Sequence, residues 1–385
     1  MWRKIRNTLI LLVLVIAALA LWKREQITRL MAVNSLFSAE RIVWNFSHMD
    51  QLFPTRAMSR GPGPVADLAD GPPLELPASI TDWIADRSVT SLVVLKDGQI
   101  VSERYFQGTG AEDRRISWSV AKSFLSALVG ILLEEGAIES LDDPVTKYAP
   151  ELVGSAYDGA TLRNVMQMAS GVEFDEDYLD FWSDINKMGR ILALGGSMDS
   201  FAAGLDQRVG EPGKEWHYVS IDTHVIGMVV RGATGRSVPD LLEEKILGPL
   251  GVEADSNYVT DGYGVAFVLG GLNLRSRDYA RFGQMYLNNG AFNGRQIVPA
   301  DWVAASTIPS APTAPEVEQY GLQWWMDWDA RPGEYFARGV YGQYIYINQP
   351  AGVVIAVNAA DRAFRTVGAY QQNIDAFRTI TDALQ

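Results

Sequence analysis

A serine placed three residues before a lysine is the part of this 385-residue chain best suited to do chemistry. Ser119 and Lys122 lie in the segment Ile116-Ser-Trp-Ser-Val-Ala-Lys-Ser-Phe-Leu-Ser-Ala-Leu-Val-Gly130, whose apolar residues recur at helical spacing from Val120 onward. Residues three apart share one face of a helix, so the hydroxyl and the amine can meet. A serine in the first turn also lies at the positive end of the helix dipole. The pair therefore predicts a serine nucleophile that is activated by a lysine.

This role makes a severe demand on Lys122. A solvated lysine titrates near ~10.4, which leaves its base form about 4–5 kcal/mol uphill at neutral pH. Burial or a neighbouring cation must lower that pKa, and the apolar run that follows Lys122 offers one wall of a burial site. A helix-capping serine beside a lysine that reaches solvent would give the same pattern, so the rest of the chain must decide between the two interpretations.

The composition narrows the possible classes of protein. The net charge is -13 and no block of lysine and arginine follows the N-terminal region, which argues against nucleic acid as a partner. The chain has no cysteine, and its histidines (His48, His217 and His224) form no metal-binding motif. No Gly-x-Ser-x-Gly elbow or phosphate-binding loop appears either. We therefore expect no metal and no cofactor. The acidic stretch from Glu173 to Asp180 lacks the spacing of a calcium loop and is predicted to be a solvated loop.

The N-terminus resembles a membrane-directed segment. Three basic residues precede an uncharged run from Thr8 to Trp22, and Lys23 and Arg24 follow at once. A run of that length spans only ~22 Å as a helix, which fits the core of a signal peptide, and Ala18-Leu-Ala20 is a possible cleavage site. However, the run continues past that site and ends in a tryptophan, a residue typical of membrane interfaces. We expect residues 1–24 to be an uncleaved inner-membrane anchor with the remaining chain in the periplasm; secretion after cleavage is the alternative.

The remaining chain is predicted to form a lead-in and one domain. Residues 25–75 hold scattered apolar residues and then Gly/Pro clusters, which mark loops, so we interpret them as a linker. Residues 76–385 should form the folded domain. Its pattern predicts a hairpin (92–95 and 99–105), the Ser119 helix, a helix from Thr161 to Ser170-Gly171, helices 238–247 and 276–287, strands 322–328, 335–338, 343–347 and 353–357, and a final helix 370–384.

Strands near both chain ends surround a mostly helical middle. This order predicts an α+β fold in which one antiparallel sheet is built from both ends of the domain, flanked by helices, with a mostly helical inserted subdomain. In this layout the Ser119 helix follows the first hairpin directly.

The arrangement resembles the serine β-lactamase and penicillin-binding-protein superfamily, and in particular the class C-like branch that includes 6-aminohexanoate-dimer hydrolase and related esterases. Ser119-Val-Ala-Lys122 is similar to the nucleophile motif of this superfamily. Pro212-Gly-Lys-Glu-Trp-His-Tyr-Val-Ser220 resembles the surroundings of its second motif, Tyr-x-Asn. The resemblance implies that Tyr218 acts with Lys122 as general base and acid. Ser220 replaces the asparagine of the motif and offers substrate only a short hydroxyl.

The third motif, Lys-Thr-Gly in β-lactamases, is replaced by Ala337-Arg-Gly339. The resemblance implies that the backbone N–H groups of Ser119 and Val340 form the oxyanion hole, while Gly339 lets its strand approach the substrate. Loss of the motif's lysine removes a cation that would bind a carboxylate and would help to depress the tyrosine pKa. Strand alternation places Arg338 on the face opposite Ala337, so we expect it to point away from the site.

The resemblance also implies that Tyr178, on the acidic loop, contacts the substrate. The function it implies is hydrolysis of a small amide or ester through an acyl-enzyme. One alternative is a D,D-carboxypeptidase or β-lactamase, which an intact third-motif lysine would favour. The other is a non-catalytic envelope binding protein, against which the joint presence of Ser119, Lys122 and Tyr218 argues.

Overall fold

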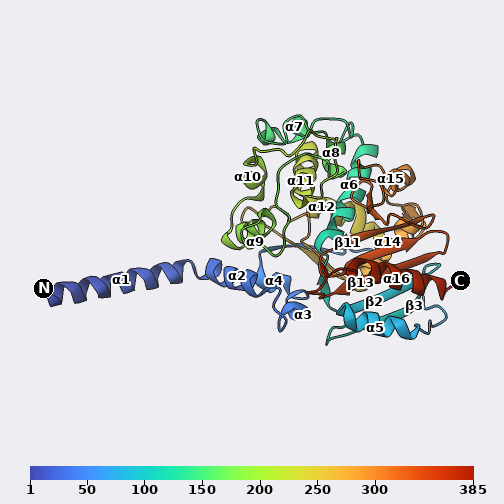
Figure 1. The fold of residues 1–385 in the computed structure, drawn as a ribbon, viewed down its shortest axis with the longest axis horizontal. Coiled ribbons are helices and arrows are strands. Elements are labelled where there is room, and N and C mark those ends of the chain that lie inside the picture. Colours follow the sequence, from blue (N-terminus) through green and yellow to red (C-terminus); the bar gives the residue numbers. More distant parts are fainter.

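A seven-stranded antiparallel sheet is the central layer of the computed structural model, which describes residues 1–385 (Figure 1). The strand order is β3-β2-β13-β12-β11-β10-β9. The β2–β3 hairpin from the start of the domain thus joins the strands from its end, because β2 pairs with β13, and this confirms the predicted α+β fold. The strands are β2 (Val89–Lys96), β3 (Gln99–Tyr105), β9 (Gln319–Tyr320), β10 (Trp325–Met326), β11 (Glu334–Gly339), β12 (Gln343–Asn348) and β13 (Val353–Ala359).

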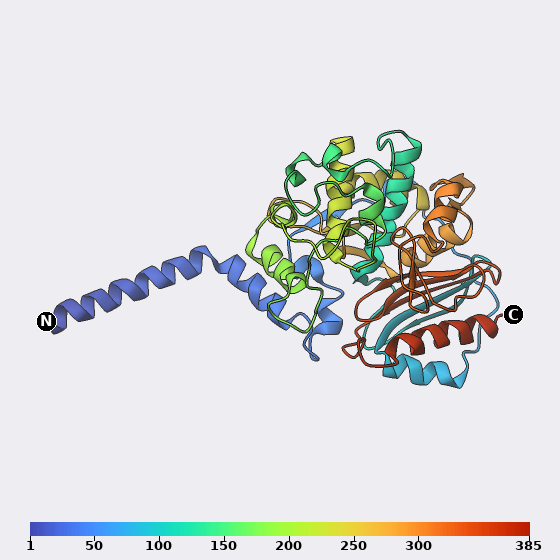
Figure 2. The same cartoon turned by 45° about the horizontal axis from the view of Figure 1, so that its top comes forward.

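Alternating side chains on the strands build a core on each face of the sheet. On β2, Leu92 and Val94 face one core, whereas Val93 and Leu95 face the other. The first core lies beneath α5 (Ala78–Asp86) and α16 (Ala369–Asp382), which cover one side of the sheet (Figure 2). The second and larger core lies between the sheet and the helical part of the molecule, with α14 (Ser276–Leu287) packed directly on β12 and β13.

The helical part occupies the chain between β4 (Arg114–Ile116) and β11 and forms the upper half of the molecule in Figure 1. Its central helix, α6 (Ala121–Glu134), carries Lys122 and is buried along twelve consecutive residues from Ala121 to Leu132. The remaining helices surround it, and they are α7 (Val145–Tyr148), α8 (Leu162–Met166), α9 (Asp184–Leu194), α10 (Met198–Ala203), α11 (Ser220–Thr234), α12 (Val238–Leu242), α13 (Gly248–Leu250) and α15 (Ala300–Ser306), with a π-helical turn at Glu243–Leu247.

A second, four-stranded sheet joins the N-terminal segment to the domain. Its order is β1-β5-β6-β4, formed by β1 (Thr55–Met58), β5 (Ser256–Val259), β6 (Leu272–Arg275) and β4 (Arg114–Ile116). A small hairpin, β7 (Ala291–Phe292) with β8 (Arg295–Gln296), lies apart from both sheets. Because β1 pairs with β5 along its whole length, the N-terminal segment is tied to the domain by backbone hydrogen bonds.

The expectation that residues 25–75 form only a linker is corrected by this packing. The helix α2 (Arg24–Ser35) lies against α9, and the short helices α3 (Ile42–Asn45) and α4 (Met49–Leu52) follow it. Apolar residues that are scattered in sequence converge on the large core because these short elements turn the chain back on itself. The buried ones are Leu36, Ile42, Phe46, Met49, Phe53 and Met58.

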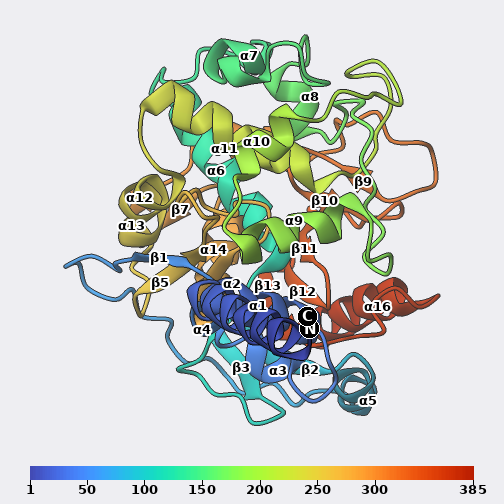
Figure 3. The ribbon, with the colours of Figure 1, turned by 90° about the vertical axis from the view of Figure 1, so that its left-hand side faces the viewer.

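The first helix stands away from the rest of the molecule. Helix α1 (Trp2–Trp22) has no buried residue and projects as a single rod, which Figure 3 views end on. It is the one helix long and apolar enough to cross a membrane, and an N-terminal signal sequence has the same properties. Its 21 residues exceed the uncharged run because the helix also includes the basic residues before it.

Two predicted elements are shorter in the structure than in the sequence pattern. The strand expected over 322–328 reduces to β10, since Gln323 has a positive φ of 65° and leaves the extended conformation. The helix expected from Thr161 ends at Met166, four residues before Ser170, and Met168 likewise has a positive φ of 54°. Helix α14 matches its predicted bounds, and the hairpin, β11–β13 and α16 match within a few residues.

Candidate active site

Ser119 lies at the junction between the small sheet and the central helix. Strand β4 ends at Ile116, a single 3₁₀ turn covers Trp118–Val120, and α6 begins at Ala121. Trp118 adopts a positive φ of 42°, a conformation that costs a bulky residue of order 1–3 kcal/mol. The indole ring is held by an aromatic cluster of Phe37, Phe46 and Tyr341, whose ring centroids lie 5.7, 5.4 and 6.3 Å away. This packing fixes the bend that presents the serine.

Lys122 is buried one helical turn after Ser119. Its side chain is 1% exposed, and its Nζ donates to Ser220 Oγ at 3.3 Å and to the Leu269 carbonyl at 3.0 Å. Burial lowers the pKa of the Lys122 amine to about 7, although the negative charges of Glu176 and Asp222 act in the opposite direction. A substantial fraction of Lys122 is thus neutral at pH 7, as a proton acceptor must be.

Tyr218 stands at the entrance of α11, two residues before the helix begins. The centroid of its ring lies 5.5 Å from Lys122 Nζ. Burial raises the pKa of the Tyr218 phenol above its usual value, while the charge of Arg338 and the hydroxyl groups of Ser119 and Ser220 lower it. At neutral pH the phenol therefore carries its proton and can donate it.

Two backbone N–H groups near the Ser119 hydroxyl have no partner in the protein. The amides of Ser119 and Val340 donate no hydrogen bond to any protein acceptor. Strand β11 comes close to the turn that carries Ser119, since a Cβ built at Gly339 would lie 2.7 Å from Ser117 O and 3.1 Å from Ser119 N. Only glycine permits this approach, and the approach leaves both donors free to bind a ligand oxygen.

A carboxylate that the sequence analysis missed lies within the site. Glu176 Oε2 accepts from the Ser220 amide at 2.9 Å, and Oε1 accepts from Ser220 Oγ at 2.6 Å and from Tyr178 Oη at 2.6 Å. Through Ser220, Glu176 connects to Lys122. The acidic stretch is therefore not simply a solvated loop, because it turns Glu176 and Tyr178 inward. The signal in its sequence was the pair of aromatic residues among the acidic ones, Phe174 and Tyr178.

Asp222 is a second buried carboxylate near the lysine. It is fully buried on the first turn of α11, and Tyr157 Oη donates to its Oδ1 at 2.8 Å. Burial raises the pKa of Asp222 to about 7, even though the polar groups of Ser170 and Tyr157 lower it. Its other oxygen has no partner. The charge state of this carboxyl is therefore coupled to that of Lys122.

Two loops meet over the mouth of the site. Arg365 donates to Asp177 at 3.2 Å, and the rings of Tyr178 and Phe364 meet edge to face with centroids 6.2 Å apart. The acidic loop and the loop before α16 thus touch across the cleft. Tyr178, predicted to contact substrate, is placed beside Ser119 by this contact.

Arg338 corrects another expectation. It does lie on the outer face of β11, but that face reaches the cleft at the end of the strand, so Arg338 lines the site instead of pointing away. The guanidinium stacks over the rings of Trp325 and Tyr370 at 5.1 and 4.7 Å and donates to Glu318 at 2.6 Å. It supplies some of the positive charge that favours a lower pKa of Tyr218.

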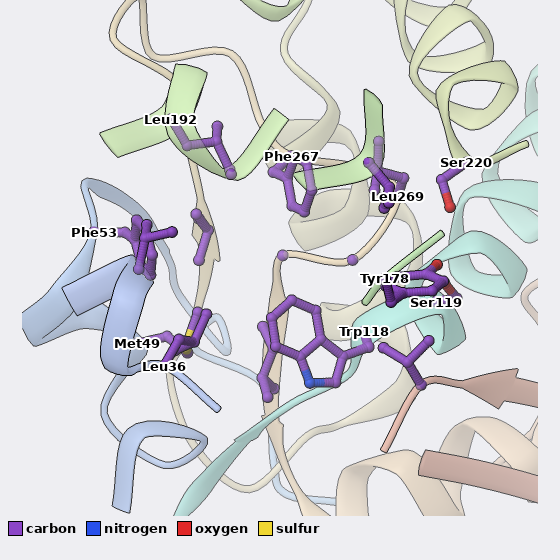
Figure 4. Close-up of a pocket in the computed structure, with 18 of the residues that line it drawn as sticks. Leu36, Met49, Phe53, Trp118, Ser119, Tyr178, Leu192, Ser220, Phe267 and Leu269 are labelled. Atoms are coloured by element: carbon purple, nitrogen blue, oxygen red, sulfur yellow. The ribbon is translucent and has the colours of Figure 1, made fainter. Parts of the chain in front are cut away.

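Ser119 lies where two cavities meet, and the charged residues around it line only one of them. One is a polar cleft lined by Tyr218, Glu176 and Arg338. The other is an apolar cavity that runs from Ser119 toward the N-terminal segment (Figure 4). Tyr178 and Val340 line both cavities.

Comparisons with known proteins identify relatives of this chain. A sequence profile named beta-lactamase matches residues 81–375. The chain is 29% identical over 330 residues to the 6-aminohexanoate-dimer hydrolase of Paenarthrobacter ureafaciens, covering 81% of this chain and 83% of the relative. It is 25% identical over 171 residues to a D-aminopeptidase of Cereibacter sphaeroides, covering 41% and 31%. A solved Bacillus anthracis protein, proposed to be a 6-aminohexanoate-dimer hydrolase, superposes with a TM-score of 0.78 at 25% identity, covering 91% and 96% of the two chains.

Proposed function

The chain belongs to the beta-lactamase family of hydrolases, and on that premise we propose that it cleaves ester or amide bonds through an acyl-enzyme on Ser119. The observation that carries this proposal is the burial of Lys122, which lowers its pKa to about 7 one helical turn from the serine. A lysine that only capped or solubilised a helix would not be buried and would keep an ordinary pKa.

In the proposed reaction, Ser119 Oγ forms a bond to the substrate carbonyl carbon as its proton passes to the amine of Lys122, with Tyr218 relaying it. The carbonyl oxygen becomes an oxyanion held by the N–H groups of Ser119 and Val340, each typically worth ~3–4 kcal/mol. Tyr218 gives a proton to the leaving amine or alcohol as the carbonyl–leaving-group bond breaks. Water then attacks the acyl-enzyme, and the acid and free Ser119 are released.

The residues around this core divide into two groups. Ser220 and Glu176 hold the lysine and are positioning residues, since both act through the contact of Ser220 Oγ with Lys122 Nζ. Tyr178 and Gly339 lie where substrate would pass, and we propose that they contact it. Ser220 also lines the apolar cavity, and because its hydroxyl hydrogen is donated to Glu176, we propose that only its oxygen contacts substrate, as an acceptor.

A covalent probe tests the proposal directly. The full chain in detergent is treated with a fluorophosphonate, and the modified peptide is located by mass spectrometry. We expect one adduct on Ser119, together with hydrolysis of 4-nitrophenyl acetate, and neither in Ser119→Ala. A wild-type protein that shows neither the adduct nor esterase activity would instead support the non-catalytic binding protein.

The alternative of a D,D-carboxypeptidase or β-lactamase requires a cation free to bind a carboxylate. The two arginines of the cleft are already paired, Arg338 with Glu318 and Arg365 with Asp177. We therefore expect turnover of a chromogenic cephalosporin and of D-Ala-D-Ala peptides to be at least a hundredfold below that of simple esters. The reverse order would favour the alternative.

We further propose that α1 anchors the protein in the inner membrane and that the catalytic domain lies in the periplasm. The support is its apolar, fully exposed surface and the basic residues at its N-terminal end. The N-terminal sequence of the protein recovered from cell membranes distinguishes an anchor, which is retained, from a signal peptide, which is removed.

A further inference from the structure

We propose that the apolar cavity beside Ser119 binds the hydrocarbon acyl chain of the substrate, so that the enzyme acts on esters or amides of medium-chain fatty acids. This inference rests on the proposed function, because it needs Ser119 to be the nucleophile. It adds a substrate class, which the family alone does not supply.

The walls of the cavity are the first argument. The cavity is narrow: the centre of a water-sized sphere can occupy about 90 Å³ of it, against about 570 Å³ of the polar cleft. Fifteen of its 21 lining residues are hydrophobic, and none is aspartate, glutamate, lysine, arginine or histidine. Ser119 and Ser220 stand at one end in Figure 4, and Leu36, Met49 and Phe53 stand at the other. A long apolar chain attached to the serine would thus have a continuous apolar surface to follow.

The position of Tyr218 gives the direction of the substrate. The proton donor to the leaving group must lie on the leaving-group side of the carbonyl. Tyr218 lines the polar cleft and does not line the apolar cavity. The leaving amine or alcohol therefore occupies the polar cleft. The acyl part of the substrate then extends in the other direction, into the apolar cavity.

The absence of charge in the cavity determines what the far end of the acyl chain can be. A terminal ammonium or carboxylate would be buried there without a partner, at a cost of several kcal/mol. A terminal methyl group would instead gain by leaving water. The cavity therefore selects alkanoyl chains against ω-amino acyl chains of the same length.

The N-terminal segment forms one wall of this cavity. Val33, Leu36, Phe37, Met49 and Phe53 all line it, and all lie between the apolar helix α1 and the sheet. The segment that directly follows the proposed membrane helix α1 thus also lines the acyl site. An amphiphile with an apolar acyl chain and a polar leaving group fits both cavities at once.

A series of esters tests the assignment with the full-length protein in one fixed detergent. The 4-nitrophenyl esters of acetate, butyrate, hexanoate and octanoate are compared with that of 6-aminohexanoate. Each methylene that enters an apolar site is worth about fourfold. We expect kcat/KM to rise at least a hundredfold from acetate to octanoate, and hexanoate to exceed 6-aminohexanoate at least thirtyfold.

A plug in the cavity separates binding there from partition of the ester into detergent. A Cβ built at Gly189, on α9, would come no closer than 3.9 Å to any atom, that atom being Val33 Cγ1. Gly189→Phe therefore directs a ring toward the cavity, and we expect the octanoate-to-acetate ratio of kcat/KM to fall at least tenfold. The matched control is Leu194→Phe, on the same helix with a side chain 52% exposed, which should keep the wild-type ratio.

The outcomes distinguish this inference from the proposed function. Alkylboronic acids, which bind an active serine, provide a measurement on the wild type alone, and their inhibition constants should fall from methyl to octyl. Equal inhibition by both, with a flat ester series and an unchanged ratio in Gly189→Phe, would overturn the acyl site while leaving a working serine hydrolase. No hydrolysis of any ester and no adduct on Ser119 would overturn both. Hydrolysis of dioctanoylphosphatidylcholine micelles would assign the acyl chain to a phospholipid, whereas turnover of the soluble octanoate ester alone would assign it to a soluble amphiphile.

Discussion

The ionisation of Lys122 results from opposing effects on one buried amine. Burial favours the neutral form, while the carboxylates of Glu176 and Asp222 favour the charged form. The resulting pKa of about 7 is close to the value that makes a general base most effective at neutral pH. In the proposed reaction a lysine can therefore take the place of a histidine as general base. The pKa of Lys122 can be lowered by removing a nearby negative charge or raised by exposing the amine to water.

The first prediction concerns the pH dependence of hydrolysis. Lys122 must be neutral to accept the serine proton, so kcat/KM should rise about tenfold per pH unit below pH 7 and level off above it. Tyr218, whose pKa burial raises, stays protonated across this range. Lys122→Arg, which remains charged, should lose about 10²–10⁴ in kcat/KM and show no such rise. A wild-type profile that is flat between pH 5 and 8 would contradict this assignment.

The second prediction concerns Glu176. Its charge raises the pKa of Lys122, so Glu176→Gln should lower that pKa and move the acid limb of the pH–rate profile to lower pH. The amide can still accept from the Ser220 backbone N–H, which preserves the local loop. Asp177→Asn, the exposed neighbour, is the control and should leave the limb where it is. A loss of activity without a shift of the limb would mean that Glu176 acts only on structure.

At the scale of elements, the site depends on how closely β11 approaches the bend before α6. The third prediction is that Gly339→Val lowers kcat about 10²–10³-fold, because its side chain would push the strand away from Ser119 N and separate the two oxyanion donors. KM should change much less, since both cavities remain. Gly210→Ala, where a Cβ would meet no atom within 4 Å, controls for adding a methyl group to the chain. Both variants are compared by steady-state kinetics and by circular dichroism.

Much of this arrangement could be predicted from the sequence, where the signal was local. The hairpin turn at Asp97-Gly98 and the apolar periodicity of α14 are contained within short windows, and both elements appear as predicted. The acidic loop could not be predicted in the same way. Glu176 faces inward because Ser220, 44 residues later, donates two hydrogen bonds to it. Nothing near Glu176 in the sequence carries that information.

The same limit explains the error about Arg338. Strand alternation correctly predicted the side of β11 on which Arg338 lies. Whether that side of the sheet borders a cleft depends on where β11 ends and on which elements pack over it. Here α16 and β10 supply Tyr370 and Trp325, and their rings hold the guanidinium at the mouth of the site. A pattern of period two contains no information about such distant neighbours.

At the scale of the whole molecule, the N-terminal region divides into two parts with different roles. Helix α1 buries nothing, whereas the segment from Leu36 to Met58 contributes six buried apolar side chains to the large core. Fully burying such a side chain is worth ~1.5–3 kcal/mol. Six of them together are comparable to the ~5–15 kcal/mol by which a domain is stable. The segment that was expected to be a linker thus contributes to the stability of the domain.

The fourth prediction follows from this division and is tested by two truncations. Removing residues 2–22 should release the protein from membranes without changing the melting temperature of the catalytic domain, because α1 has no buried residue. Its kcat/KM for 4-nitrophenyl acetate should stay within about twofold of the wild type. Removing residues 2–58 should abolish cooperative unfolding, because it takes away β1, two of the aromatic rings that support Trp118 and six core residues.

The competing expectation treats residues 25–75 as a linker. The family profile begins at residue 81, so on that view both truncated proteins should fold equally well. Thermal unfolding followed by circular dichroism separates the two expectations. A cooperative transition in the protein that lacks residues 2–58 would show that the segment from Leu36 to Met58 is not needed for the stability of the fold.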